Sequence, residues 1–152
     1  MKNVWMNESD SKGLQVLSRR LEAATGLSTD NKEEPFMIGN YGIGGSYGVH
    51  PDYHHPESST DNRIMTTMTV VSSPVQGGTT VWPFLGVSVI LQKGDTLIWK
   101  NLSNEGDPLV LTHHAACPVL LGDKWIVNKW LSYNEQWNRN KCMRTAVNKS
   151  MK

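Results

Sequence analysis

Two histidines and one aspartate in this sequence are suited to bind a metal ion together. His50 and Asp52 stand two positions apart in an extended segment, so their side chains are expected on one face of a strand. His114 lies in a distant segment. Two imidazoles and one carboxylate can hold ferrous iron and leave its other coordination positions open. The pattern predicts an iron site formed by His50, Asp52 and His114.

Three further histidines compete for the same role. His54 and His55 are neighbours, and neighbours in a strand point to opposite faces, so they are a poor pair for one metal. His113 and His114 likewise cannot both face the site. A histidine is more often hydrogen-bonded or exposed to solvent than a ligand, and from the residues alone this interpretation stays open.

Lys124 follows His114 by ten residues. Pro118 cannot lie in a central strand, so the strand that holds His114 should end there and the chain should return at Lys124. The Lys124 ammonium could then hold the far carboxylate of a 2-oxo dicarboxylate that chelates the iron. The alternative is that Lys124 lies in water at a turn.

The elements that must position these residues are a helix and a set of strands. Leu14, Leu17, Leu21 and Ala24 recur at helical spacing and predict an amphipathic helix over 13–25, which ends at Gly26. Pro35 ends any helical continuation.

After Pro35 the sequence consists of short β-branched and aromatic runs broken by Gly, Pro, Asn and Ser. These runs predict strands near 36–42, 46–53, 63–72, 86–91, 95–101, 109–115 and 124–131. The glycine-rich run over 41–47 lacks the ending of a phosphate loop and is interpreted as a turn. We predict a mainly β fold, a double-stranded β-helix (jelly roll), in a single domain over 1–152. Its core covers 36–142, and 143–152 form a tail.

Composition excludes some classes of partner. The chain has 152 residues, with 15 basic and 14 acidic residues and a net charge of +1, so we expect neither nucleic acid nor a membrane as partner. Cys117 and Cys142 allow one disulfide or two buried thiols. Sequons at Asn7, Asn101 and Asn148 point weakly to an oxidising compartment.

Five runs of the sequence, taken in order, carry a resemblance to a known family. They are Asn62-Arg63-Ile64, Gly77-Gly78-Thr79-Thr80-Val81-Trp82-Pro83, Lys93-Gly94-Asp95-Thr96, His114-Ala115-Ala116-Cys117-Pro118-Val119-Leu120 and Asn128-Lys129-Trp130-Leu131. These runs resemble the catalytic domain of the collagen prolyl 4-hydroxylase alpha subunit, and the resemblance covers the chain from about Trp5 to Cys142.

The resemblance implies roles for individual residues. His50, Asp52 and His114 resemble the iron ligands, and no catalytic residue beyond the iron site is expected. Lys124 resembles the residue that pairs with the distal carboxylate of 2-oxoglutarate, and Thr66 would add a hydroxyl to that site. Tyr47 and Arg63 are similar to positions that border the peptide groove. Cys117 and Cys142 match a family disulfide.

The resemblance also implies an activity and its partners. It implies a procollagen-proline 4-dioxygenase that uses Fe(II), 2-oxoglutarate, O2 and L-ascorbate on proline-rich or collagen-like peptides. Its place would be the endoplasmic reticulum lumen, with protein disulfide isomerase as beta subunit, although the targeting and assembly regions are outside this chain.

Two departures motivate alternatives. The segment between Asp52 and Arg63 is shorter than is usual in the family, and Ser132 stands where the family commonly has a histidine that faces the peptide. A second hypothesis is therefore a catalytically impaired relative that binds Pro-rich peptides or subunits. A third keeps the chemistry and changes the target to a secreted protein other than collagen.

Overall fold

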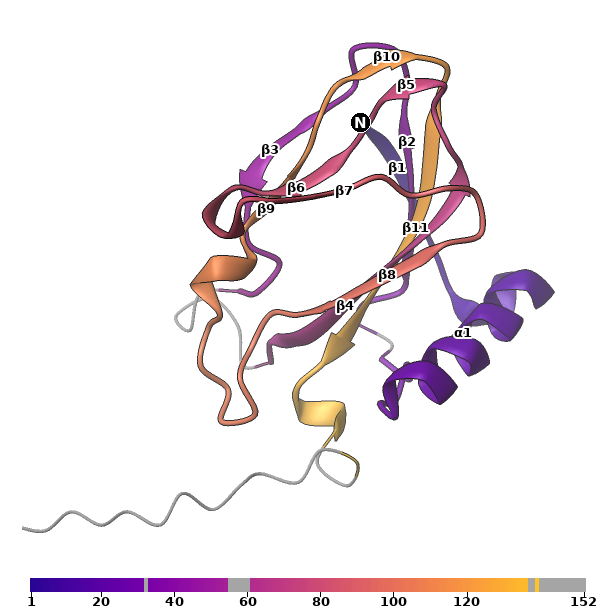
Figure 1. Ribbon diagram of the computed structural model, residues 1–152. Helices are drawn as coiled ribbons and strands as arrows, with labels where there is room; N and C mark the ends of the chain where they lie inside the picture. Colours follow the sequence, from indigo (N-terminus) through magenta and orange to yellow (C-terminus); the bar gives the residue numbers. More distant parts are fainter. Residues whose placement is uncertain (32, 55–60, 137–138, 140–152) are drawn as a thin grey trace, which may run out of the picture.

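The fold consists of two facing antiparallel sheets, with one helix on the outer side of the larger sheet (Figure 1). The computed structural model describes residues 1–31, 33–54, 61–136 and 139. The predicted jelly roll with an N-terminal helix is confirmed.

The larger sheet has five strands in the order β1 (Lys2–Met6), β2 (Phe36–Tyr41), β11 (Lys124–Ser132), β4 (Arg63–Ser72) and β8 (Thr96–Lys100). The smaller sheet has four, in the order β3 (Tyr47–His50), β9 (His114–Ala116), β6 (Thr80–Trp82) and β7 (Val87–Val89). A short pair, β5 (Gln76–Gly77) and β10 (Val119–Leu121), lies at one end. Single turns of 3-10 helix are η1 (Glu8–Asp10), η2 (Pro83–Leu85), η3 (Val110–Thr112) and η4 (Asn134–Gln136).

The helix α1 (Lys12–Thr25) matches the predicted range within one residue. Ser11 caps its start by accepting from the Gly13 backbone N–H, and Gly26 ends it at a positive φ of 72°. Leu14 and Leu21 pack on Phe36 of β2 and Val127 of β11. No helix among the described residues is long and apolar enough to cross a bilayer.

The core between the two sheets is formed by alternate residues of the central strands. Met37, Tyr41, Met68, Ile126 and Trp130 make one buried cluster there, because residues two apart in a strand face the same side. β11 is buried along almost its whole length, between β2 and β4. The interior face of β11 therefore delivers side chains to the space between the sheets.

The predicted strands differ from the observed ones in several places, and β5, β6 and β10 were not among the predicted strands. The segment 109–115 is not one strand: Val110–Thr112 form η3, where the Thr112 hydroxyl donates to the Leu109 carbonyl at 2.6 Å, and the strand begins only at His114. Such a local bond competes with ladder pairing. No strand was predicted over the residues of β1, because an exposed edge strand shows little hydrophobic alternation.

Candidate metal centre

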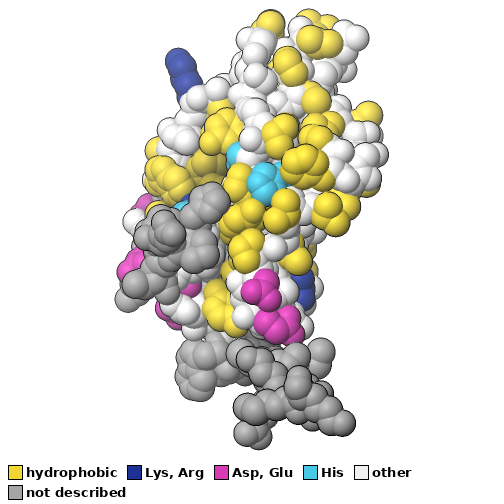
Figure 2. Space-filling model, turned by 90° about the vertical axis from the view of Figure 1, so that its left-hand side faces the viewer, with side chains coloured by type: hydrophobic (Ala, Val, Ile, Leu, Met, Phe, Trp, Pro, Cys, Tyr) yellow, Lys and Arg dark blue, Asp and Glu magenta, His cyan; other side chains and the backbone are white. Residues whose placement is uncertain are grey.

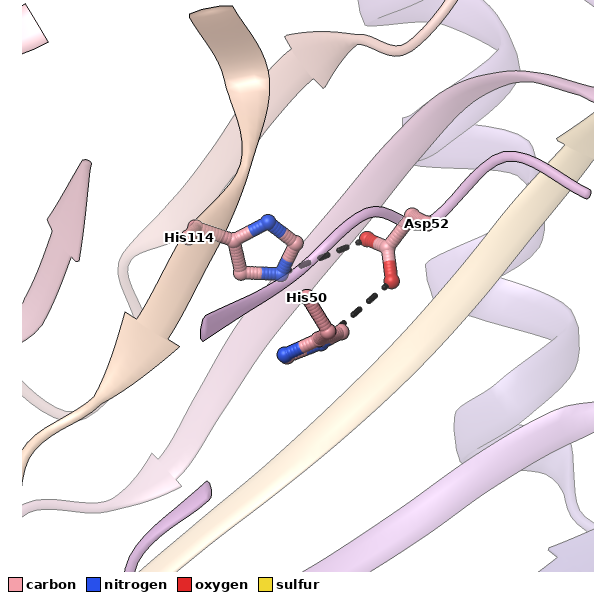
Figure 3. Close-up of side chains that lie close together, drawn as sticks. All are labelled: His50, Asp52 and His114. Carbon is pink, nitrogen blue, oxygen red and sulfur yellow. Dashed lines mark ion pairs between the residues drawn. The ribbon is translucent and has the colours of Figure 1, made fainter. Parts of the chain in front are cut away.

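Three side chains from two adjacent segments converge on one point (Figure 3). His50 ends β3 and His114 begins β9, and the two residues are opposite each other in the antiparallel pair. Asp52 lies two residues beyond the end of β3, in a bend, not in the strand as predicted. One ligand atom of each residue lies within 4.8 Å of the others. The predicted triad is therefore assembled in space.

Each oxygen of the Asp52 carboxylate faces one of the two imidazoles, whose ring centroids lie 4.4 Å apart (Figure 3). His50 Nε2 is 3.7 Å from Asp52 Oδ1, and His114 Nε2 is 3.5 Å from Asp52 Oδ2. Asp52 is 5% and His114 6% exposed, whereas His50 is partly exposed. The site is thus closed on the side of Asp52 and His114 and open on the side of His50.

Backbone carbonyls orient both imidazole rings. His50 Nδ1 is 2.7 Å from the Gly48 carbonyl oxygen, and His114 Nδ1 is 3.1 Å from that of Thr112. A carbonyl only accepts, so Nδ1 carries the proton and the Nε2 lone pair faces the shared point. Burial lowers the pKa of His114, although Asp52 opposes the shift, so this imidazole is neutral at physiological pH.

The donor set fits a divalent transition metal such as ferrous iron. Among the described residues, no lysine or arginine side chain pairs with the buried Asp52 carboxylate: the groups around it are the two imidazoles and the Thr66 hydroxyl. A buried carboxylate is costly without a positive partner. A divalent ion held by two nitrogens and one oxygen would supply the missing charge.

Two tryptophans pack on the inner side of the site. The Trp99 ring lies 4.8 Å from the His114 ring, edge to face, and Trp82 lies 5.8 Å away. Tyr47 contacts His50 on the open side at 4.2 Å. The tryptophans fix the His114 ring and exclude water from it. Nothing in the sequence separates them from ordinary core residues.

Lys124 is buried and lies among neutral acceptors. Its side chain is 3% exposed, and its Nζ donates to the Gly78 carbonyl at 2.8 Å and the Thr80 hydroxyl at 3.2 Å. No carboxylate forms an ion pair with it in the described part of the chain. Burial lowers the pKa of Lys124 to about 8. The alternative of a lysine in water at a turn is therefore wrong, whereas the role of Lys124 in binding 2-oxoglutarate stays a prediction.

Tyr41 of β2 lies near both Lys124 and the metal centre. The Lys124 Nζ lies 5.7 Å from the centre of the Tyr41 ring, and Tyr41 also lines a cavity of about 270 Å³ that reaches His50 and Asp52. Burial raises the pKa of Tyr41 to about 12, so its phenol keeps its proton. Sequence reasoning missed Tyr41 and Thr80 because neither stands in a pattern of its own.

The same cavity has an aromatic wall and an open mouth. Trp130 and Asn128 of β11 line it, and Met1 and Trp5 border it from the N-terminal segment. Figure 2 shows hydrophobic side chains around exposed histidine on the face at which β3, η2 and η3 lie.

The residues predicted for co-substrate and peptide lie near the site, with other partners. The Thr66 hydroxyl donates to Asp52 Oδ2 at 2.7 Å. Arg63 forms two bonds to the Glu34 carboxylate, at 2.7 and 2.8 Å, and a third to the Asp52 backbone carbonyl at 3.3 Å. Tyr47 is exposed beside His50. The binding roles of Thr66, Arg63 and Tyr47 stay predictions.

The competing histidines do not join the triad. His54 Nε2 lies 3.4 Å from Glu34 Oε1, and His113 Nδ1 lies 2.6 Å from the Val110 carbonyl oxygen. His55 lies outside the described residues.

Several other predictions depend on the C-terminal part of the chain. Cys117 is unpaired within the described residues, but Cys142 and the predicted tail lie outside them, so the disulfide stays a prediction. Ser132 is buried and donates to the Asp61 carboxylate. The Ser132 side chain thus makes a polar contact with another residue of the protein.

Comparison with known proteins gives a consistent result. The family model described as the 2OG-Fe(II) oxygenase superfamily matches residues 36–132. The chain is 38% identical to prolyl 4-hydroxylase subunit alpha-2 of Caenorhabditis elegans in an alignment of 148 residues that covers 93% of this chain and 27% of that protein. It is also 38% identical to subunit alpha-1 of Gallus gallus, again over 93% of this chain and 28% of that protein. The chain therefore spans about a quarter of the length of these relatives.

Solved structures share the fold. The viral collagen prolyl hydroxylase of Paramecium bursaria Chlorella virus-1, solved as a 2OG complex, has a TM-score of 0.77 at 21% identity over 86% of this chain and 77% of that one. A Pseudomonas putida prolyl-4-hydroxylase has a TM-score of 0.60 at 16% identity over 85% of this chain and 70% of that one.

Proposed function

The chain belongs to the 2OG-Fe(II) oxygenase superfamily, and we propose that it is an Fe(II)- and 2-oxoglutarate-dependent dioxygenase that hydroxylates peptidyl proline at C4. One observation carries the proposal. The interior between the two sheets has a site for a divalent metal, formed by His50, Asp52 and His114, and a buried ammonium without a carboxylate partner among the described residues, that of Lys124. A metal-chelating dicarboxylate needs these two charges.

The residues would divide the work as follows. His50, Asp52 and His114 would hold the iron, which when bound supplies oxidation by O2 coupled to the conversion of 2-oxoglutarate to succinate and CO2. One oxygen atom of O2 goes to succinate and the other to proline. Lys124 would hold the distal carboxylate, because a charge-assisted bond in a dry site is strong. Trp82 and Trp99 would exclude water from the side of the metal centre at which His114 lies.

A peptide substrate is supported by the open side of the site. His50 and Tyr47 are accessible there, and the nearby surface carries exposed apolar residues: Val49, Phe84, Leu85, Val110 and Leu111. Proline rings pack well on aromatic and apolar surface, and a proline-rich chain loses little entropy when it binds. The relatives are prolyl 4-hydroxylase subunits, so we propose a proline-rich or collagen-like peptide as substrate.

Further proposals follow from the family alone. They are the use of ascorbate, protein disulfide isomerase as partner and the endoplasmic reticulum lumen as location. One of the three sequons does not support that location: Asn101 is buried and donates its amide N–H to Thr66, so it is not accessible for glycosylation in the folded protein. Asn7 is exposed and remains the accessible sequon among the described residues.

The experiment is mass spectrometry of a (Pro-Pro-Gly)n peptide incubated with the protein, Fe(II), 2-oxoglutarate, ascorbate and O2. We expect the peptide to gain one oxygen atom for each succinate formed. Succinate without peptide oxidation would exclude this substrate and support the choice of another target. Absence of both products, with metal still bound, would support a catalytically impaired binding module.

A further inference from the structure

The Asp52 carboxylate is held by a chain of two uncharged side chains. The Thr66 hydroxyl donates to Asp52 Oδ2 at 2.7 Å, and the Asn101 amide nitrogen donates to the Thr66 hydroxyl oxygen at 2.8 Å. Thr66 is on β4, whereas Asn101 follows β8. Side chains from three separate segments thus form one chain of hydrogen bonds, which ends at a carboxylate oxygen of Asp52.

The direction of these hydrogen bonds is fixed by chemistry. The Asn101 amide nitrogen can only donate, so the Thr66 oxygen accepts there. A hydroxyl has a single proton, and that proton is donated to Asp52. It cannot be donated at the same time to a carboxylate of 2-oxoglutarate. In this structure the proton of the Thr66 hydroxyl is thus used by Asp52, and the co-substrate contact implied by the resemblance stays a prediction.

The chain of bonds lies in a dry part of the interior. Thr66 is 0% and Asn101 1% exposed. Thr66 is flanked in the sheet by its two cross-strand partners, Trp130 of β11 and Trp99 of β8. A hydrogen bond in such surroundings is stronger than in water, and no solvent competes for the carboxylate oxygen.

The Asn101 backbone is itself anchored at both ends. Its N–H donates to the Ile64 carbonyl at 2.8 Å, and its carbonyl accepts from Leu109 at 2.9 Å. The last torsion of an aspartate is only weakly restricted, so a carboxylate without a fixed donor can rotate. Here Thr66 on a strand paired on both sides, supported by an asparagine with a fixed backbone, restricts that rotation.

We propose that Thr66, supported by Asn101, is the positioning residue of the metal centre: it fixes the plane of the Asp52 carboxylate so that the carboxylate faces the Nε2 atoms of His50 and His114. This proposal rests on the proposed function, since it takes Asp52 as a metal ligand. Neither residue touches the metal. Groups that orient a ligand from behind commonly change metal affinity by about 10- to 100-fold when they are removed.

If Thr66 only stabilised the fold, its loss would not affect metal binding more than the loss of another buried threonine. The neighbouring residue Thr67 allows this comparison. Thr67 is as deeply buried as Thr66 on the same strand, but its hydroxyl donates to the Lys129 backbone carbonyl at 3.2 Å, away from the metal centre. Thr67→Val is therefore the matched control for Thr66→Val. Both remove one buried hydroxyl at almost equal volume.

The experiment measures Mn(II) affinity of the metal-free protein by loss of the free-ion EPR signal, with thermal unfolding of each apo variant alongside. Thr66→Val should bind Mn(II) about 10- to 100-fold more weakly than wild type, and Thr67→Val should bind it as wild type does. Thr66→Ser keeps the hydroxyl and should restore the affinity. Asn101→Leu should cause a smaller loss, because the hydroxyl can still donate to Asp52.

The possible failures are distinguishable. If Thr66→Val and Thr67→Val bind Mn(II) equally, the positioning role is refuted while the metal site stands. The same holds if Thr66→Ser behaves as Thr66→Val. If wild type binds no more tightly than Asp52→Ala, the metal site itself and the proposed function fail.

Discussion

His50 and His114 are opposite each other in the β3–β9 pair only because β3 contains a bulge. Tyr47 pairs with Ala116, but His50 pairs with His114, so two residues of β3 stand against one of β9. With regular pairing from Tyr47, His50 would face His113. Opposite residues of an antiparallel pair lie on the same face. The bulge therefore decides which of two adjacent histidines joins the metal centre.

The first prediction follows from this register. His114→Ala should abolish peptide-dependent decarboxylation of 2-oxoglutarate, because one of three metal ligands is lost. His113→Ala should keep most of the activity, since its ring contacts Tyr53 and Phe84 outside the triad. The measurement is succinate formation with saturating peptide. Turnover by His114→Ala, or equal loss in both variants, would contradict the ligand assignment.

The second prediction concerns the buried ammonium. Lys124→Met should raise the KM for 2-oxoglutarate by about 10- to 100-fold, as expected for the loss of one charge-assisted bond of about 1.5–3 kcal/mol. Lys129→Met is the control. Lys129 is equally buried on β11 but donates to the backbone carbonyls of Asn31 and Glu34 on the other face. It should lower stability and leave the KM for 2-oxoglutarate unchanged, and a similar rise in both variants would argue against a specific role of Lys124.

The third prediction is a pH dependence of co-substrate binding. The pKa of Lys124 is lowered to about 8, and the ammonium is the form that binds a carboxylate. Below pH 8 the group is charged and binding is maximal. Above pH 8 the free protein loses the charge, so affinity should fall by up to about tenfold per pH unit until the higher pKa of the complex is reached.

Calorimetry of 2-oxoglutarate binding to the Mn(II)-loaded protein between pH 7 and 9.5 checks this slope. The pKa of His114 is lowered from its usual value near 6.5, so it does not titrate in this range. Lys124→Met should bind weakly at every pH, without the slope. An affinity of the wild type that stays constant across the range would show that Lys124 does not carry the titration.

The fourth prediction separates two roles for Arg63. Its guanidinium is bound by Glu34 and lies 4.1 Å from the centre of the Trp130 ring. Arg63→Ala and Glu34→Gln should both lower the free energy of unfolding, by about 1.5–3 kcal/mol, because each leaves a partly buried charge without its partner. Urea titration measures this, and a double-mutant cycle gives the coupling energy. A rise in peptide KM with unchanged stability would instead support the predicted peptide contact.

Local pattern in the sequence predicted the elements well where hydrophobic periodicity is strong. The range 63–72 predicted for β4 matches Arg63–Ser72, and the helix begins one residue before its predicted start and ends as predicted. The three residues of the triad and Lys124 could also be proposed from the sequence, because the ability of a side chain to bind a metal or an anion depends on its residue type. What the sequence determined is thus the kinds of groups available and the strands and helix that carry them.

Tertiary structure decided which of these groups meet. The β3 bulge brings His50 opposite His114. Asn101 donates to Thr66, which in turn donates to Asp52, and β1 borders the cavity although its own pattern is weak. Each of these depends on the register between segments that are distant in the chain. Periodicity along one strand fixes which face a side chain takes, but a shift of one residue against the neighbouring strand changes its partner, and only the assembled sheets fix that shift.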